Sequence, residues 1–184
     1  MLNAGEQIVA SYLRYIRKCD FIQTNLYTKG EQGEIDVVGI NLSENRVYLC
    51  EVAIHLITGL FYGKGGQYNN IDKLTDKFSK DIEYARKYLH EYKPTFMLWS
   101  PIITDSKGKA ENNQTMHLEA ISNNIRKKYK VEIKMVVNEK FQACLDEMRD
   151  FAEKQTEVLQ CPIMRFMQIE AYLKKHLTKK KKCS

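Results

Sequence analysis

Two stretches decide the fold: Gly33-Glu34-Ile35-Asp36-Val37-Val38-Gly39 and, further along, Tyr48-Leu49-Cys50-Glu51-Val52. Each places one carboxylate, Asp36 or Glu51, inside a run of apolar residues that is typical of a buried strand. The residues between them, 41–45, predict a hairpin. An ionised carboxylate inside a strand is costly unless it is paired or binds a cation. The pattern therefore predicts two acids on adjacent strands with a shared need for a cation.

Glu6 is a third acid in an apolar pattern. It falls in a stripe with spacings of three and four, which predicts one face of a helix over residues 3–18. The other members of the stripe are Leu2, Val9, Leu13 and Ile16. Three converging carboxylates repel one another, and a hard divalent cation relieves that repulsion. The alternative is that each acid lies at the edge of its element in water, and the residues alone leave both interpretations open.

Outside these stretches the pattern predicts alternating strands and helices. Strands are expected at 20–27, 34–40, 46–54, 95–99 and 131–137, and helices at 3–18, 69–90, 114–128, 139–156 and 163–177. The glycine-rich residues 58–67 predict a loop. The order predicts an α/β protein with a mixed sheet flanked by helices in residues 1–138. A helical extension, 139–177, is expected to pack on this core or form a dimer surface.

The composition of the 184 residues fits one globular domain. No apolar run approaches the roughly 20 residues that span a bilayer, and the first residues do not resemble a secretory signal. Five scattered cysteines predict reduced thiols in a cytoplasmic protein without structural zinc. The net charge of +6 comes entirely from six lysines after Glu170. The basic tail, 178–184, is interpreted as a disordered, solvated terminus. The alternative is that it binds phosphates weakly and in a salt-dependent way.

The two acidic stretches together resemble the core of the PD-(D/E)XK nuclease superfamily. Gly5-Glu6 and Asn25 look most like its Holliday-junction-resolvase and Mrr-like branches. The resemblance implies a restriction-endonuclease-like αβββαβ core. It also implies hydrolysis of phosphodiester bonds in DNA, including structured or branched DNA, that depends on Mg²⁺ or Mn²⁺. Relatives in this branch are commonly dimers, so a homodimer is left open.

The resemblance also assigns roles to single residues. Asp36 and Glu51 would hold the metal, with the Val52 carbonyl as a further ligand, and Glu6 would match a helical glutamate of this branch. Ala53 stands where the family has a lysine that orients and activates the attacking water. Either another residue has taken this role, or the chain is a catalytically impaired protein of the nuclease fold. Such a protein would bind nucleic acid or a protein partner.

Four residues are candidates to replace the missing lysine. His55 comes first, because strand alternation returns it to the face of Glu51 and an imidazole accepts protons near neutral pH. Lys64, Gln67 and Lys73 follow, because the loop and the next helix come directly afterwards. The lysines of the 69–90 helix fall roughly opposite its apolar stripe and predict a solvated face, with DNA-backbone contact as the second interpretation. They are Lys73, Lys77, Lys80 and Lys87.

Overall fold

A five-stranded mixed sheet forms the centre of the structure, a computed structural model that describes residues 3–28, 33–64, 67–105 and 113–182. Its strands, in order across the sheet, are β1 (Phe21–Tyr27), β2 (Glu34–Asn41), β3 (Arg46–Val52), β6 (Lys93–Ser100) and β7 (Ile133–Val137). β1, β2 and β3 pair antiparallel, whereas β3, β6 and β7 pair parallel. A separate hairpin joins β4 (Gly63–Lys64) to β5 (Gln67–Tyr68).

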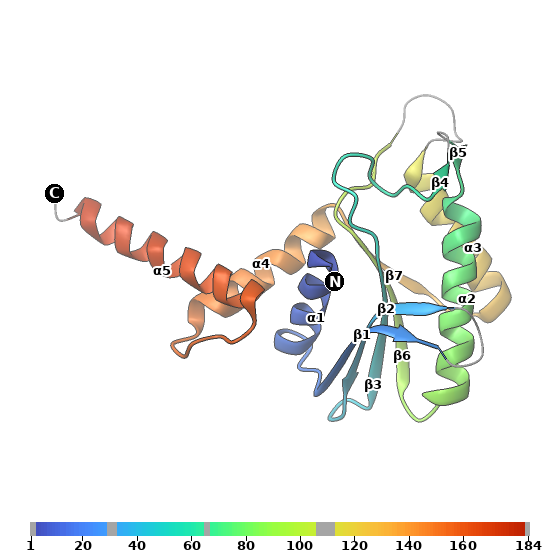
Figure 1. The fold of residues 1–184 in the computed structure, drawn as a ribbon, viewed down its shortest axis with the longest axis horizontal. Helices are drawn as coiled ribbons and strands as arrows, with labels where there is room; N and C mark the ends of the chain where they lie inside the picture. The colour runs from blue at the N-terminus through green and yellow to red at the C-terminus, as the bar shows by residue number, and fades with distance from the viewer. Residues whose placement is uncertain (1–2, 29–32, 65–66, 106–112, 183–184) are drawn as a thin grey trace.

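Helices cover both faces of this sheet (Figure 1). α2 (Asn70–Tyr88) and α3 (Gln114–Tyr129) cover one face, and Phe78, Ile82 and Ile121 pack there with Leu49 and Leu98. α1 (Ala4–Tyr15), α4 (Glu139–Lys154) and α5 (Pro162–Lys182) lie on the other side of the sheet. Residues from these three helices share a second apolar cluster with the strands; they include Leu13, Met148, Met164, Cys50 and Trp99. The predicted α/β class, with a mixed sheet between helices, is confirmed.

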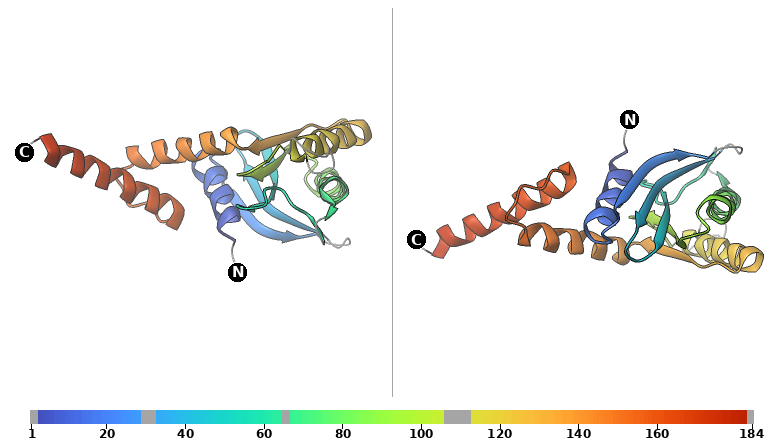
Figure 2. Two further views of the ribbon diagram at one scale, coloured as in Figure 1. Left: turned by 90° about the horizontal axis from the view of Figure 1, so that it is seen from above. Right: turned by 90° about the horizontal axis from the view of Figure 1, so that it is seen from below.

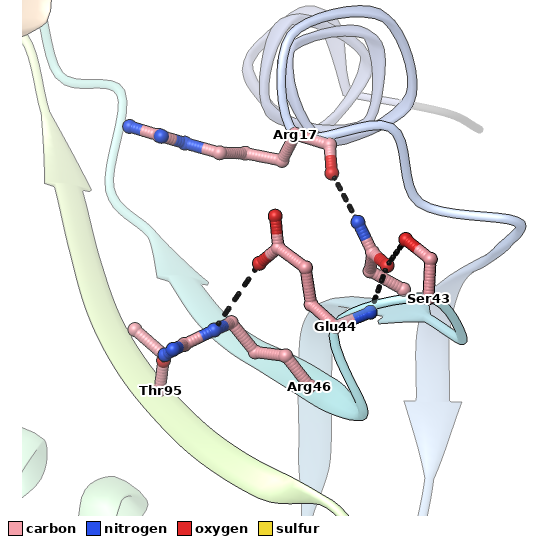
Figure 3. A network of polar contacts seen from close by, with 6 residues as sticks. Arg17, Ser43, Glu44, Arg46 and Thr95 are labelled. Carbon is pink, nitrogen blue, oxygen red and sulfur yellow. Dashed lines mark hydrogen bonds and ion pairs between the residues drawn. The ribbon is translucent and has the colours of Figure 1, made fainter.

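The hairpin between β2 and β3 fixes the register of the two acidic strands. Buried Asn41 donates to the Arg17 carbonyl, and its Oδ1 accepts from the Ser43 hydroxyl and the Glu44 amide (Figure 3). Arg46 pairs with Glu44 and donates to Thr95 of β6. Because a slip of one residue would turn every side chain to the other face, these bonds determine which residues point at α2.

Two of the sequence-based boundaries are wrong in ways that bear on function. β3 ends at Val52 instead of residue 54. α5 continues to Lys182, so residues 178–182, expected in a disordered tail, are helical. Lysine is a good helix former, and no glycine or proline interrupts this stretch. Within the described residues, no helix is long and apolar enough to cross a membrane.

Candidate active site

The register of β2 and β3 brings Asp36 beside Glu51. Val37 pairs with Cys50, and Asp36 and Glu51 are the next residues along the two strands. Both carboxylates meet one ammonium group, that of Lys77 from α2. Its Nζ lies 3.5 Å from Asp36 Oδ1 and forms a hydrogen-bonded ion pair with Glu51 Oε2. The two acids therefore share one cation at the end of the sheet nearest the β3–β4 connection.

Both carboxylates are largely shielded from water. The Glu51 side chain is 0% exposed, and that of Asp36 is 15% exposed. Asp36 Oδ2 also accepts a hydrogen bond of 2.7 Å from the Val52 N–H, which fixes the carboxylate against β3. Burial alone would lower the pKa of Lys77, but Glu51 and Asp36 outweigh it and raise that pKa. The two carboxylates therefore favour the charged form of Lys77.

The prediction that the lysines of α2 form a solvated face is wrong for Lys77. Leu74 and Phe78 face the sheet, and Lys77 lies between them in the sequence, at the edge of the buried stripe. Its side chain is only 32% exposed, and its ammonium reaches the strands. A lysine stem can pack along apolar surface while its charged end bonds elsewhere, so position opposite a stripe does not establish solvation. Exposed Lys73, one turn earlier, remains on the surface.

Asp81, which is not among the site residues predicted from the sequence, is a further acid beside Asp36 and Glu51. It lies one turn after Lys77 and is 2% exposed. It falls within the apolar stripe of α2, between Phe78 and Ile82, and that placement is the signal that could have identified it. Glu51 Oε1 and Asp81 Oδ2 are buried without a hydrogen-bond partner among the described residues.

Repulsion between neighbouring acids raises pKa values in this site. Burial, followed by repulsion from Asp81 and Asp36, raises the pKa of Glu51 well above its usual value, and Lys77 offsets this only in part. Burial likewise raises the pKa of Asp81 to about 7, although Lys77 acts in the opposite direction. The site thus holds more negative charge than one lysine neutralises, which favours a further cation or a retained proton.

Glu6 reaches the same end of the sheet from α1. With the Asn25 amide nitrogen turned toward the acids, it donates to Glu6 Oε2 at 3.1 Å and to Glu34 Oε1 at 3.0 Å. Asn25 has a positive φ of 51°, which interrupts the regular course of β1 opposite Asp36. Burial, followed by repulsion from Asp36, raises the pKa of Glu6. Glu6 therefore lies within electrostatic reach of Asp36, which in turn shares Lys77 with Glu51.

Gly5 allows α1 to approach the end of β3 closely enough for this contact. A Cβ at Gly5 would overlap Ile54 Cγ1 and come within 3.1 Å of Val52 Cγ1. We expect Gly5→Val to lower the free energy of unfolding by about 1–3 kcal/mol, because the branched side chain overpacks this contact. Urea denaturation measures the change, with Ala4→Val at the exposed neighbouring position as the control. Equal effects of the two substitutions would show that the contact is not tight.

The structure does not place His55 where it was expected to replace the missing lysine. His55 lies beyond the end of β3, so strand alternation does not apply to it, and it is exposed. Its ring packs edge-on against Tyr62, with centroids 6.3 Å apart. Tyr62 lies within electrostatic reach of Lys77, and burial raises its pKa. The side chains of Lys64 and Gln67 lie outside the described residues. Ala53 is buried in the cluster beneath α2 and α3.

The described residues offer few side chains of the kind that bind metal ions at one place. Within the described ranges, no group of three or more His, Cys, Asp and Glu side chains is arranged to hold a metal ion. The pair Asp36 and Glu51 is a smaller set that would need backbone or water ligands besides. Comparisons with models of known families, with curated proteins and with solved structures find no match. The geometry of the site therefore carries the functional argument.

The raised pKa of Asp81 gives an expected pH dependence of stability. Between its ordinary value of 3.8 and about 7, the folded protein holds a proton that the unfolded chain releases. The free energy of unfolding of chelator-treated protein should therefore fall as the pH rises from about 5 to about 7. Asp81→Asn should narrow the difference between the melting temperatures at these two pH values. Asp72→Asn, at an exposed position on α2, is the control. An unchanged difference in Asp81→Asn would refute this assignment.

Proposed function

We propose that the chain is a metal-dependent DNA endonuclease that hydrolyses phosphodiester bonds, including those of structured or branched DNA. The observation that carries this proposal is the position of Lys77, whose ammonium contacts both Asp36 and Glu51. Two acids and one ammonium form the set that the resemblance to PD-(D/E)XK nucleases requires. In this chain the ammonium comes from α2 instead of position 53, which directly follows β3.

The donor atoms fit Mg²⁺ or Mn²⁺. Asp36 and Glu51 offer hard carboxylate oxygens, and the buried Glu51 Oε1 has no hydrogen-bond partner among the described residues. The Val52 carbonyl is the candidate for a further ligand. A bound divalent ion would lower the pKa of a water molecule and offset the charge on the scissile phosphate.

The side chains have separate roles in this proposal. Asp36 and Glu51 hold the cation, and the Val52 N–H keeps Asp36 oriented. Lys77, held between the acids, stabilises negative charge that develops on the phosphate and orients the attacking water. Glu6 adds negative charge beside Asp36 and so favours a cation at this end of the sheet. A DNA substrate is consistent with the cytoplasmic location expected from the cysteines.

The same contacts support a second candidate function. A lysine that is already bonded to both carboxylates neutralises part of their charge, so a metal ion would have to compete with it. In that case the chain is a catalytically impaired protein of the nuclease fold that binds nucleic acid or a protein partner. The two candidates differ in whether metal produces cleavage.

A cleavage assay separates these candidates. Purified protein is incubated with supercoiled plasmid, single-stranded DNA and branched DNA, each with Mg²⁺, with Mn²⁺ and with chelator. We expect strand breaks only where a metal ion is present. Gel retardation of DNA without cleavage under every condition would favour the impaired alternative. The absence of both cleavage and retardation would contradict a role on DNA.

A further inference from the structure

α5 carries an apolar face that the described part of the chain leaves uncovered. Four large side chains, between 49% and 68% exposed, follow one another at spacings of three and four residues. They are Phe166, Ile169, Leu173 and Leu177. The opposite side of the helix is buried through Met164 and Met167. Both views of Figure 2 show α5 extending away from the sheet.

The second half of α5 depends little on the rest of the chain. All described side chains from Tyr172 to Thr178 are exposed. Among the described residues, two side chains connect this part to α4 and the segment after it. The Tyr172 hydroxyl donates to the Gln155 carbonyl, and Lys175 contacts both the carbonyl and the carboxylate of Glu153. About three turns of helix with so few contacts are marginal in water, since isolated helices shorter than about 12–15 residues rarely persist. A partner packed on the apolar face would supply the missing stabilisation.

The shape of the exposed face indicates that this partner is another helix. Glu170, Leu173, Lys174 and Leu177, together with Thr178, line a hollow of about 420 Å³. The first four stand at positions i, i+3, i+4 and i+7, which is the arrangement that receives one side chain of a facing helix in knobs-into-holes packing. The face therefore carries both a hollow and large apolar side chains that could fill the same hollow on a second helix.

We propose that this face packs antiparallel against α5 of a second copy of the chain. The apolar stripe runs from residue 166 to residue 177, so antiparallel pairing about its midpoint places Phe166 opposite Leu177 of the second copy. In the same register Ile169 faces the hollow of the second copy. Glu170, which also lies 3.8 Å from Arg149 Nε of its own chain, then falls within one residue of Lys174 of the second copy, so the register that matches the apolar residues also brings opposite charges together.

The distribution of charge selects the antiparallel arrangement. All six excess lysines follow Glu170 in the sequence, and four of them are residues 179–182. Parallel pairing would place these lysines side by side, whereas antiparallel pairing separates the two groups by about 27 Å at 1.5 Å per residue. The stripe is only about 18 Å long. A stripe of this length should bury less than the roughly 800 Å² per partner of a standard interface, so we expect a weak dimer that dissociates at micromolar concentrations.

Sedimentation equilibrium of the full chain over a range of concentrations tests this proposal. We expect a monomer–dimer equilibrium for the wild-type protein and a dissociation constant at least about 100-fold higher for Leu173→Glu, which buries two charges in the interface. Met116→Glu on α3 is the matched control, because Met116 is 49% exposed but lies outside the stripe. It should leave the equilibrium unchanged. Circular dichroism verifies that each variant remains folded.

A charge exchange tests the register. Glu170→Lys and Lys174→Glu should each weaken the dimer, and the double variant should restore it, because both opposite-charge contacts are rebuilt. Wild-type protein that stays monomeric at every concentration, or a Leu173→Glu variant that dimerises normally, would overturn the proposal. It would also be overturned if the protein were monomeric and bound phosphatidylserine vesicles through this face, since a lipid surface would then be the occupant.

Discussion

Replacing Lys77 with methionine will reduce the proposed metal-dependent DNA cleavage by about 10²–10³-fold, because it removes the preorganised positive charge that the proposal places beside the scissile phosphate. Methionine keeps most of the side-chain volume but leaves Asp36 and the fully buried Glu51 without their shared cation. Breaking a buried ion pair on one side is strongly destabilising, so we also expect a loss of about 3 kcal/mol at neutral pH. Single-turnover cleavage and urea denaturation measure the two effects.

Lys73→Met provides the matched control, because Lys73 lies one turn earlier on the same helix and is exposed. It should change neither cleavage nor stability appreciably. The double variant Ala53→Lys/Lys77→Met introduces an ammonium at position 53, directly after β3, and should recover part of the activity. Ala53→Lys alone should not, because it crowds a second cation beside Lys77. A Lys77→Met variant that cleaves at the wild-type rate would exclude Lys77 from the proposed reaction.

Asp36→Asn will lower metal-dependent cleavage to background while leaving the protein folded. The substitution removes one of two charged metal donors, yet its amide oxygen can still accept the hydrogen bond from the Val52 N–H. Lys77 also keeps its contact with Glu51. We therefore expect a change of less than about 1 kcal/mol in the free energy of unfolding. Asp72→Asn, at an exposed position of α2, is the control for both measurements.

The outcome for Asp36→Asn separates a functional carboxylate from a structural one. If the variant unfolds, Asp36 serves mainly to pair Lys77 and to hold the Val52 N–H. If it folds and cleaves DNA as well as the wild-type protein, Asp36 takes no part in catalysis.

The acidic part of the site could be predicted because it follows from strand periodicity. Asp36 and Glu51 lie in adjacent apolar strands joined by a short hairpin, so their pairing is a local property of residues 33–52. Glu6 lies in the apolar stripe of α1, and the approach of that helix to β3 places it beside Asp36. Charged residues inside apolar patterns were informative because burial of a charge is costly.

The rest of the site could not be predicted from hydrophobic periodicity, because it depends on how the helices pack on the sheet. Lys77 reaches Asp36 and Glu51 only because α2 packs across the end of β3, and its long side chain spans the gap. His55 was placed on the face of Glu51 by assuming that β3 continued, but the strand ends at Val52. Asp81 shows that a charged residue inside a helical stripe carries the same information as one inside a strand.

Calorimetric titration of Mn²⁺ into chelator-treated protein tests most directly whether Asp36 and Glu51 form a metal site. We expect the wild-type chain to bind a metal ion at this site and the folded Asp36→Asn variant to lose that binding. Lys77 should remain in the site in both proteins. A folded wild-type chain that binds no Mn²⁺, or that binds it equally well after Asp36→Asn, would contradict a metal-dependent nuclease.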